Sequence, residues 1–169
     1  MRNKLILINL IILTSSIKGQ DTISEIDYLN AVSIEALGNG VLFSINYERY
    51  LLKKNIYKIS ARTGITYHPM IKGFNDYGGP GIILEINNSI GNSKHNLEIG
   101  IGANFAYLYE KPVGDRLLLY STPRLGYKYE SNNRLFLRIG FTPLIVLYSN
   151  SDPINVKRAW FGVGLGSRF

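Results

Sequence analysis

The final segment of the chain, residues 159–169, alternates strictly between two kinds of side chain. One set comprises Ala159, Phe161, Val163, Leu165, Ser167 and Phe169, and the other comprises Trp160, Gly162, Gly164, Gly166 and Arg168. Because successive side chains of a β-strand point to opposite faces, this segment is predicted to be a strand with one mostly apolar face and one face crowded by glycine. Such a strand fits a sheet that separates lipid from a tightly filled interior.

The same alternation recurs along the chain and predicts eight strands, at 30–37, 41–51, 56–68, 81–90, 95–109, 117–129, 134–148 and 158–169. Most are longer than the roughly 5 to 6 residues usual in globular proteins, and near or above the roughly 9 to 11 that a tilted strand needs to cross hydrocarbon. The predicted fold class is therefore all-β, an eight-stranded antiparallel up-and-down transmembrane β-barrel.

Residues 1–20 differ in composition from the rest of the chain. Two basic residues precede an apolar run over 5–13, and Gly19 supplies a small residue near the end of the segment. This order is typical of a secretory signal peptide, and the apolar run is too short to span a bilayer as a helix. A buried N-terminal helix is the alternative, but the segment has no amphipathic face. The predicted organisation is a signal peptide at 1–20 and one outer-membrane β-barrel domain at 21–169.

The connections between predicted strands alternate in length. Tight polar turns are predicted at 52–55, 91–94 and 130–133, and longer loops at 69–80, 110–116 and 149–157. Short turns on one side and longer loops on the other are typical of outer-membrane barrels, whose short side is periplasmic. The sequence Gly38-Asn39-Gly40 is predicted to form a tight hairpin and a short external loop.

Glycine and aromatic residues indicate which face meets lipid. Glycines gather on the polar face of the predicted strands, at Gly64, Gly100, Gly102, Gly126, Gly140, Gly162, Gly164 and Gly166. An eight-stranded barrel has an interior just wide enough for side chains, so this crowded face is predicted to be the inside. Outward aromatic residues are predicted near one end (Tyr47, Tyr57, Tyr127, Tyr129 and Phe169) and near the other (Phe43, Tyr67, Phe105, Tyr107, Tyr109 and Phe161), as in the girdles of membrane barrels.

The inward face also carries charges of both signs. The predicted set is Glu35, Glu48, Glu85, Glu98, Lys58, Arg62, Arg124, Lys128, Arg138, Arg158 and Arg168. Acids and bases in a narrow interior pair with one another, so we predict a plugged lumen, with a porin-like, cation-lined anion channel as the alternative. Pro123 and Pro143 fall inside predicted strands, where neither can donate a ladder hydrogen bond, and bulges are expected there.

No residue is predicted to be catalytic, cofactor-binding or metal-ligating, and no cofactor is predicted. The chain has no cysteine, which excludes disulfides, thiolate metal sites and lipoprotein acylation. It also contains none of the common hydrolase or nucleotide-binding motifs. The modest basic excess is scattered over alternating strands, so a nucleic-acid partner is not expected. Of the two histidines, His95 is predicted to be a periplasmic surface residue, and His68 to face inward at the external end of its strand.

The mature chain resembles a known family in its first hairpin and its last residue. The stretch Asn30–Gly40, followed by Phe43–Tyr47, is similar to the first hairpin of small outer-membrane β-barrel proteins of the type common in Bacteroidota, which have an OmpA/OmpX-like architecture. The terminal Phe169 resembles the signal that the barrel-assembly machinery reads in these proteins. The resemblance implies a monomer in the cell outer membrane of a Gram-negative bacterium, in contact with outer-membrane lipid and lipopolysaccharide.

The resemblance favours a structural or surface-interaction role without catalysis, and two alternatives stay open. Some eight-stranded outer-membrane enzymes modify the acyl chains of lipid A from a histidine near the rim, which would place an active site near His68. That histidine lies beside the 69–80 loop, which holds Asp76 and Tyr77, but this loop has no serine, and the nearest candidates are Ser149 and Ser151. A soluble exported lipid-binding barrel, with its apolar face inward, is the other alternative.

Overall fold

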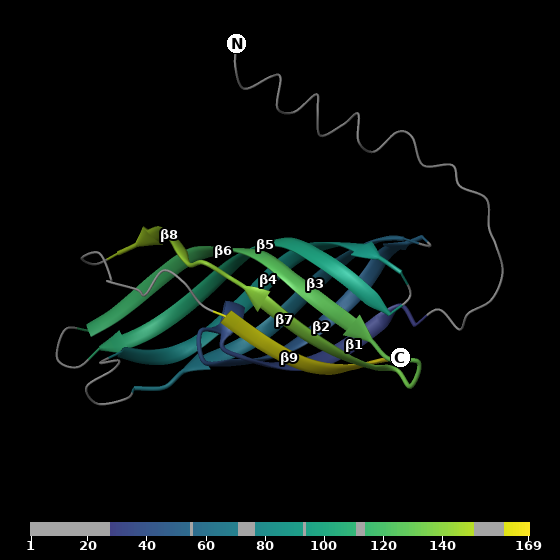
Figure 1. Ribbon diagram of the computed structural model, residues 1–169. Coiled ribbons are helices and arrows are strands. Elements are labelled where there is room, and N and C mark those ends of the chain that lie inside the picture. The colour runs from purple at the N-terminus through teal and green to yellow at the C-terminus, as the bar shows by residue number, and fades with distance from the viewer. Residues whose placement is uncertain (1–27, 55, 71–76, 93, 111–113, 151–160) are drawn as a thin grey trace, which may run out of the picture.

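The computed structural model describes residues 28–54, 56–70, 77–92, 94–110, 114–150 and 161–169, which form a β-barrel (Figure 1). Its strands are β1 (Asn30–Ala36), β2 (Phe43–Lys53), β3 (Tyr57–His68), β4 (Tyr77–Gly91), β5 (His95–Glu110), β6 (Gly114–Glu130), β7 (Leu135–Phe141), β8 (Ile145–Ser149) and β9 (Phe161–Arg168). A short 3-10 turn, η1 (Gly38–Gly40), joins β1 to β2. No helix within these ranges has the length and apolar character needed to cross a membrane. The predicted signal peptide at 1–20 lies outside them.

Antiparallel pairing runs around the barrel and returns to its start. Each of β1 to β5 pairs with the strand that follows it, and β9 pairs with β1. Both β7 and β8 pair with β6, and β7 also pairs with β9. Because β7 and β8 together occupy one strand position, the predicted eight-stranded antiparallel barrel is confirmed.

The two ends of the barrel differ in what they carry. At the terminal end, on the right in Figure 1, the described chain begins at Tyr28 and ends at Phe169, and tight turns follow β2, β4 and β6. At the loop end, on the left, β3, β5 and β8 end and β4 and β6 begin. Strands reach further toward the loop end than predicted, since β4 begins at Tyr77 and β6 at Gly114. Once the apolar part of a ladder has fixed the register, backbone pairing continues through polar residues.

The predicted strand at 134–148 is interrupted between β7 and β8. The β6 register is the same on both sides of the break, which places Pro123 directly opposite Pro143. Neither residue can donate a backbone hydrogen bond, so their juxtaposition confines two missing donors to one place in the wall. On its other side Pro123 stays in an unshifted ladder, opposite Ile101 of β5. The predicted bulges at these prolines are therefore wrong.

A register shift does occur nearer the loop end than Pro123. It lies between Leu119 and Tyr120, where β6 pairs with β8. At this shift β8 loses the alternation of the other strands, and its residues from Ile145 to Tyr148 are all exposed. One inserted residue on β8 turns the following side chains to the other face.

The turn of the first hairpin, η1, lies inside the barrel and does not form the predicted external loop. All three residues of η1 are buried, and Asn39 is 0% exposed. The turn is entered and left through left-handed backbone, with φ of 60° at Leu37, 67° at Gly38 and 67° at Val41. That conformation is costly for a β-branched residue such as valine, so tertiary contacts must hold the turn in place.

The barrel is apolar outside and polar over most of its inside. Ile34, Ile65 and Ile101 are 62–63% exposed, whereas Arg62 and Arg138 are at most 2% exposed. The aromatic residues predicted for the two girdles all lie on the outer surface, with Tyr57 half-buried among its neighbours. The predicted glycines line the inside, where Gly126 is half-buried and the others are buried. The predicted sense of the two faces is confirmed.

Candidate functional site

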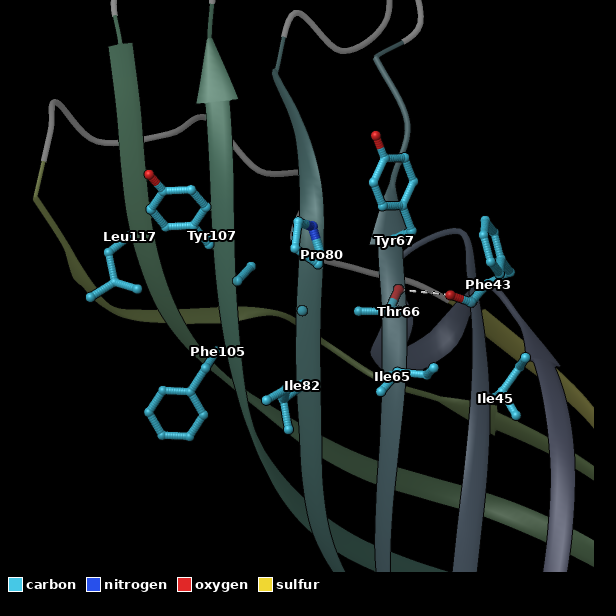
Figure 2. A pocket seen from close by; sticks show the side chains of 12 residues that line it. Phe43, Ile45, Ile65, Thr66, Tyr67, Pro80, Ile82, Phe105, Tyr107 and Leu117 are labelled. Carbon is cyan, nitrogen blue, oxygen red and sulfur yellow. Dashed lines mark hydrogen bonds between the residues drawn. The ribbon is translucent and has the colours of Figure 1, made fainter.

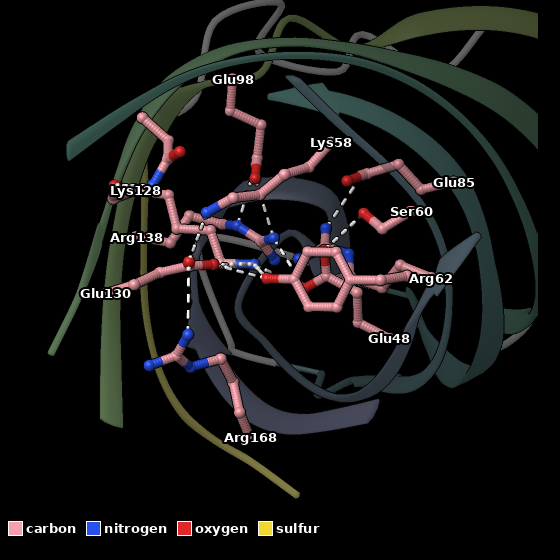
Figure 3. Close-up of polar contacts among 12 residues, drawn as sticks. Glu48, Lys58, Ser60, Arg62, Glu85, Glu98, Lys128, Glu130, Arg138 and Arg168 are labelled. Carbon is pink, nitrogen blue, oxygen red and sulfur yellow. Dashed lines mark hydrogen bonds and ion pairs between the residues drawn. The ribbon is translucent and has the colours of Figure 1, made fainter. Parts of the chain in front are cut away.

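The interior of the barrel holds a network of ionised side chains that converge from all around the wall (Figure 3). The acids are Glu35, Glu48, Glu85, Glu98 and Glu130, and the bases are Lys58, Arg62, Arg124, Lys128, Arg138 and Arg168. Every strand except β8 contributes at least one member. The inward positions of a period-two pattern carry these residues, so the backbone aims them at one another without any loop.

The middle of the network is built on Glu35. Arg62 Nη1 lies 2.6 Å from one carboxylate oxygen of Glu35, and Arg124 Nη2 lies 2.6 Å from the other. Both arginines also contact Glu85, at 2.9 Å from Arg62 and 3.3 Å from Arg124. Two acids on β1 and β4 are thereby shared by two bases on β3 and β6, which compensates each charge in a region closed to water.

Arg138 links this middle part to the terminal end. Its Nη2 donates to Glu48 at 2.8 Å and to Glu98 at 2.9 Å. Glu48 accepts two further hydrogen bonds, from Lys128 at 3.1 Å and from the hydroxyl of Ser60 at 2.5 Å. Glu98 has Arg124 as its other basic neighbour, at 4.0 Å. Arg138 is therefore the main partner of Glu98.

Glu130 closes the network at the terminal end. It accepts hydrogen bonds from the Tyr50 hydroxyl at 2.5 Å and from Lys58 at 2.6 Å, and Arg168 of the last strand lies 3.4 Å away. Lys128 also contacts Tyr50, whose hydroxyl lies 2.7 Å from its Nζ. The C-terminal strand is thus tied into the interior through a side chain as well as through its ladders.

The predicted inward charges are confirmed wherever the structure describes them. Arg158 lies outside the described residues. Glu130 was predicted to lie in the turn at 130–133 and is instead an inward residue at the end of β6. The alternation that places Arg124 and Lys128 inside continues to Glu130, which is the next inward position after Lys128. The inward position of Glu130 could therefore have been predicted from the sequence.

At the loop end the interior changes from charged to apolar. Five buried residues pack together there, with Val41 and Tyr77 against them: Ala106, Leu108, Leu118, Tyr120 and Leu144. The predicted polar interior is therefore correct for the middle and terminal end only. An apolar cluster above a charged network excludes water and strengthens the ion pairs beneath it.

The η1 turn joins the apolar cluster to the charged network. Asn39 accepts hydrogen bonds from Arg124 at 3.1 Å and, through its backbone carbonyl, from the Tyr120 hydroxyl at 3.3 Å. The Thr66 hydroxyl lies 2.8 Å from the carbonyl oxygen of Gly40. Gly38 packs directly against Gly162, where a Cβ on Gly162 would lie 2.8 Å from the Gly38 Cα. These contacts come from β3, β6 and β9 and hold the strained turn in the lumen.

The two histidines lie at opposite ends of the barrel. His68 faces inward at the loop end of β3, as predicted, and is 4% exposed, and its Nε2 has no hydrogen-bond partner among the described residues. The predicted neighbours Asp76 and Ser151 lie outside those residues. His95 is exposed at the terminal end, hydrogen-bonded to the Tyr127 hydroxyl and packed against the ring of Tyr129. The described residues do not assemble a nucleophile, a base and an acid at His68.

Comparison with known proteins gives a likeness of fold. No family model matches the sequence, and no curated protein matches it. Among solved structures, the chain is similar to the N-terminal β-barrel domain of OprF from Pseudomonas aeruginosa, with a TM-score of 0.55 and 15% sequence identity. The alignment covers 82% of this chain and 97% of that domain. At this identity the match supports the eight-stranded antiparallel barrel and says nothing of activity.

Proposed function

We propose that this chain is an integral outer-membrane β-barrel with a plugged interior and a structural or surface-interaction role without catalysis. The proposal rests on a side-chain distribution opposite to that of a water-soluble protein, with apolar residues outside and charged residues inside. Large apolar residues cover the outside of every strand, and the fully buried large side chains include Arg62, Arg124, Arg138 and Lys128. The fold is shared with an outer-membrane barrel domain, which is consistent with this environment.

The apolar wall is too extensive for a protein surrounded by water. Soluble monomers rarely expose a continuous apolar patch above a few hundred Å². Each large apolar side chain moved from water into an apolar medium contributes roughly 1.5 to 3 kcal/mol. Summed over the wall, that free energy exceeds the roughly 5 to 15 kcal/mol of net stability of a typical domain. Hydrocarbon around the barrel removes the penalty, and the closed sheet leaves no backbone edge to desolvate.

The alternatives fit the structure less well. A soluble lipid-binding barrel needs an apolar cavity inside, whereas the inside of this barrel holds the ion-pair network. A cation-lined anion channel needs unpaired bases along a bore, whereas the buried arginines of β3, β6 and β7 each contact at least two glutamates. A rim enzyme at His68 would require its lipid substrate to reach a side chain that is 4% exposed.

Orientation and partners follow from the same arrangement. In the proposed orientation the terminal end faces the periplasm and the loop end faces outward, where lipopolysaccharide would surround the barrel. Phe169 is 53% exposed at the end of the last strand, and its proposed partner during assembly is the barrel-assembly machinery. Its backbone also pairs with Asn30, so the terminal residue belongs to the closure of the barrel.

Cell fractionation combined with gel mobility tests the proposal. Expressed with its signal peptide in a Gram-negative host, the protein is expected in the outer-membrane fraction. It should migrate faster before boiling than after, because a folded barrel resists unfolding by dodecyl sulfate. Recovery in the soluble periplasmic fraction, with identical mobility before and after boiling, would contradict the proposal.

A further inference from the structure

An apolar groove crosses the outer wall near the loop end (Figure 2). It encloses about 560 Å³ and spans β2 to β6. Among the residues that the structure describes, no charged side chain lines it. The wall elsewhere needs only to be apolar to meet fluid lipid, so a defined hollow in it calls for a separate explanation.

Two rows of outward side chains border the groove. The row nearer the loop end contains Phe43, Tyr67, Pro80, Tyr107 and Leu117, and the row beneath it contains Ile45, Ile65, Ile82 and Phe105. Between the rows, Thr66, Gly81 and Ala106 lie side by side with their side chains directed inward or absent. Backbone therefore forms the floor of the groove.

Pro80 makes a notch in the row nearer the loop end. It pairs with Tyr67 on β3, and the β4–β5 register places it beside Tyr107. Figure 2 shows the two tyrosine rings on either side of the compact proline. The Tyr107 ring is held by a hydrogen bond to Asp115 and by an edge-to-face contact with Tyr109, whose centroid is 5.8 Å away. The Tyr107 wall of the notch is thus held in place by its neighbours.

The size and chemistry of the groove indicate the class of ligand. Its volume falls within the roughly 300 to 1,000 Å³ of small-molecule sites. It is lined by 12 residues, fewer than the roughly 20 to 30 residues per side of a stable protein interface. Aliphatic and aromatic walls lie beneath the hydroxyls of Tyr67 and Tyr107, which point toward the loop end in Figure 2. The groove is thus polar toward the loop end and apolar toward the middle of the barrel, which matches an amphiphile at a membrane interface.

We propose that this groove is a binding site for one acyl chain of a membrane lipid. The chain lies along β4 over Pro80 and Ile82, between the rings of Tyr67 and Tyr107, and the polar end of the lipid lies at the level of the tyrosine hydroxyls. The groove recognises the chain by shape, because no charged side chain lines it to select a headgroup. This inference rests on the proposed membrane location, since the lipid reaches the groove from the bilayer.

Native mass spectrometry of the detergent-extracted barrel tests the site, with dimyristoyl phosphatidylcholine and dimyristoyl phosphatidylglycerol as probe lipids. Pro80→Phe fills the notch, and Tyr107→Ala removes one wall. Ala103→Phe is the matched control, because Ala103 also faces outward on β5 but does not line the groove. Wild type and Ala103→Phe are expected to hold one lipid of either headgroup, and the two groove variants to bind it about tenfold more weakly or worse.

Gel mobility and fractionation of the same variants report folding and membrane location independently of lipid binding. Equal retention of lipid by wild type, Pro80→Phe and Tyr107→Ala would overturn the acyl-chain site while leaving membrane residence intact. A dimer of the chain that Pro80→Phe abolishes would also overturn it, in favour of a second copy as the occupant. Loss of lipid from Ala103→Phe to the same degree would show that the wall as a whole, and not the groove, retains lipid.

Discussion

Replacing Arg138 with methionine removes the charge that links the two parts of the interior while keeping much of the side-chain volume. Arg138 is 1% exposed and donates to both Glu48 and Glu98. After the change Glu48 still has Lys128 at 3.1 Å and Ser60 at 2.5 Å. Among the described bases Glu98 then keeps only Arg124, at 4.0 Å, so the cost concentrates on this one carboxylate.

The expected loss follows from leaving one buried carboxylate poorly compensated. Breaking a buried ion pair by removing one partner costs roughly 3 to 5 kcal/mol. We expect that decrease in the free energy of unfolding for Arg138→Met, measured by urea titration of the barrel refolded in detergent and followed by circular dichroism and gel mobility. Adding Glu98→Gln to Arg138→Met removes the stranded charge and should recover about half of the loss or more.

Arg49→Met is the matched control for this experiment. Arg49 lies on β2 and faces outward, and it is exposed, so the same substitution should change stability by no more than about 0.5 kcal/mol. A loss for Arg138→Met no larger than that for Arg49→Met would show that Glu98 does not depend on Arg138 for charge compensation. If the Arg138→Met/Glu98→Gln double variant loses as much stability as its two single variants together, the ion-pair network is contradicted as well. The two interior charges would then act independently.

Three further predictions concern closure, assembly and the plug. Gly166→Ala places a Cβ 2.3 Å from the Phe136 ring, so urea titration should show a decrease of about 1 to 3 kcal/mol in the free energy of unfolding. Adding Phe136→Leu should recover part of this loss. An unchanged free energy of unfolding for Gly166→Ala would contradict the close packing. Deleting Phe169 should lower the yield in the outer membrane while the detergent-refolded barrel stays folded, and unchanged yield would remove its role in assembly. Wild type and Asn39→Ala should both lack large stable currents in planar bilayers; steady wild-type conductance would contradict the plugged lumen.

Period-two alternation predicted the number of strands and which residues share a face, and the glycines and aromatic residues then indicated which face carries the inward charges. Each of these depends on where a side chain points, and that is a local property of a strand. Glu85 and Arg138, for example, were assigned inward from their own segments alone, and both are buried in the network.

The features that the sequence did not yield depend on partners far along the chain. Gly38-Asn39-Gly40 has the composition of an ordinary external turn, and its inward position depends on Arg124 and Tyr120, 85 and 81 residues from Asn39. Pro123 and Pro143 were each visible as a problem, but their common solution requires the register between two strands. The groove was missed because Pro80 was assigned to a loop, whereas it lies within β4.

The most direct test of the account is labelling of single cysteines on intact cells with a membrane-impermeant thiol reagent. The native chain has no cysteine, and Met70 at the loop end and Asn132 at the terminal end are both exposed. We expect Met70→Cys to be labelled on intact cells, and Asn132→Cys to be labelled only after the outer membrane is permeabilised. Labelling of Asn132→Cys on intact cells, with Met70→Cys protected, would contradict the orientation. Protection of both cysteines until the cells are opened, with the protein in the soluble fraction, would contradict the membrane barrel itself.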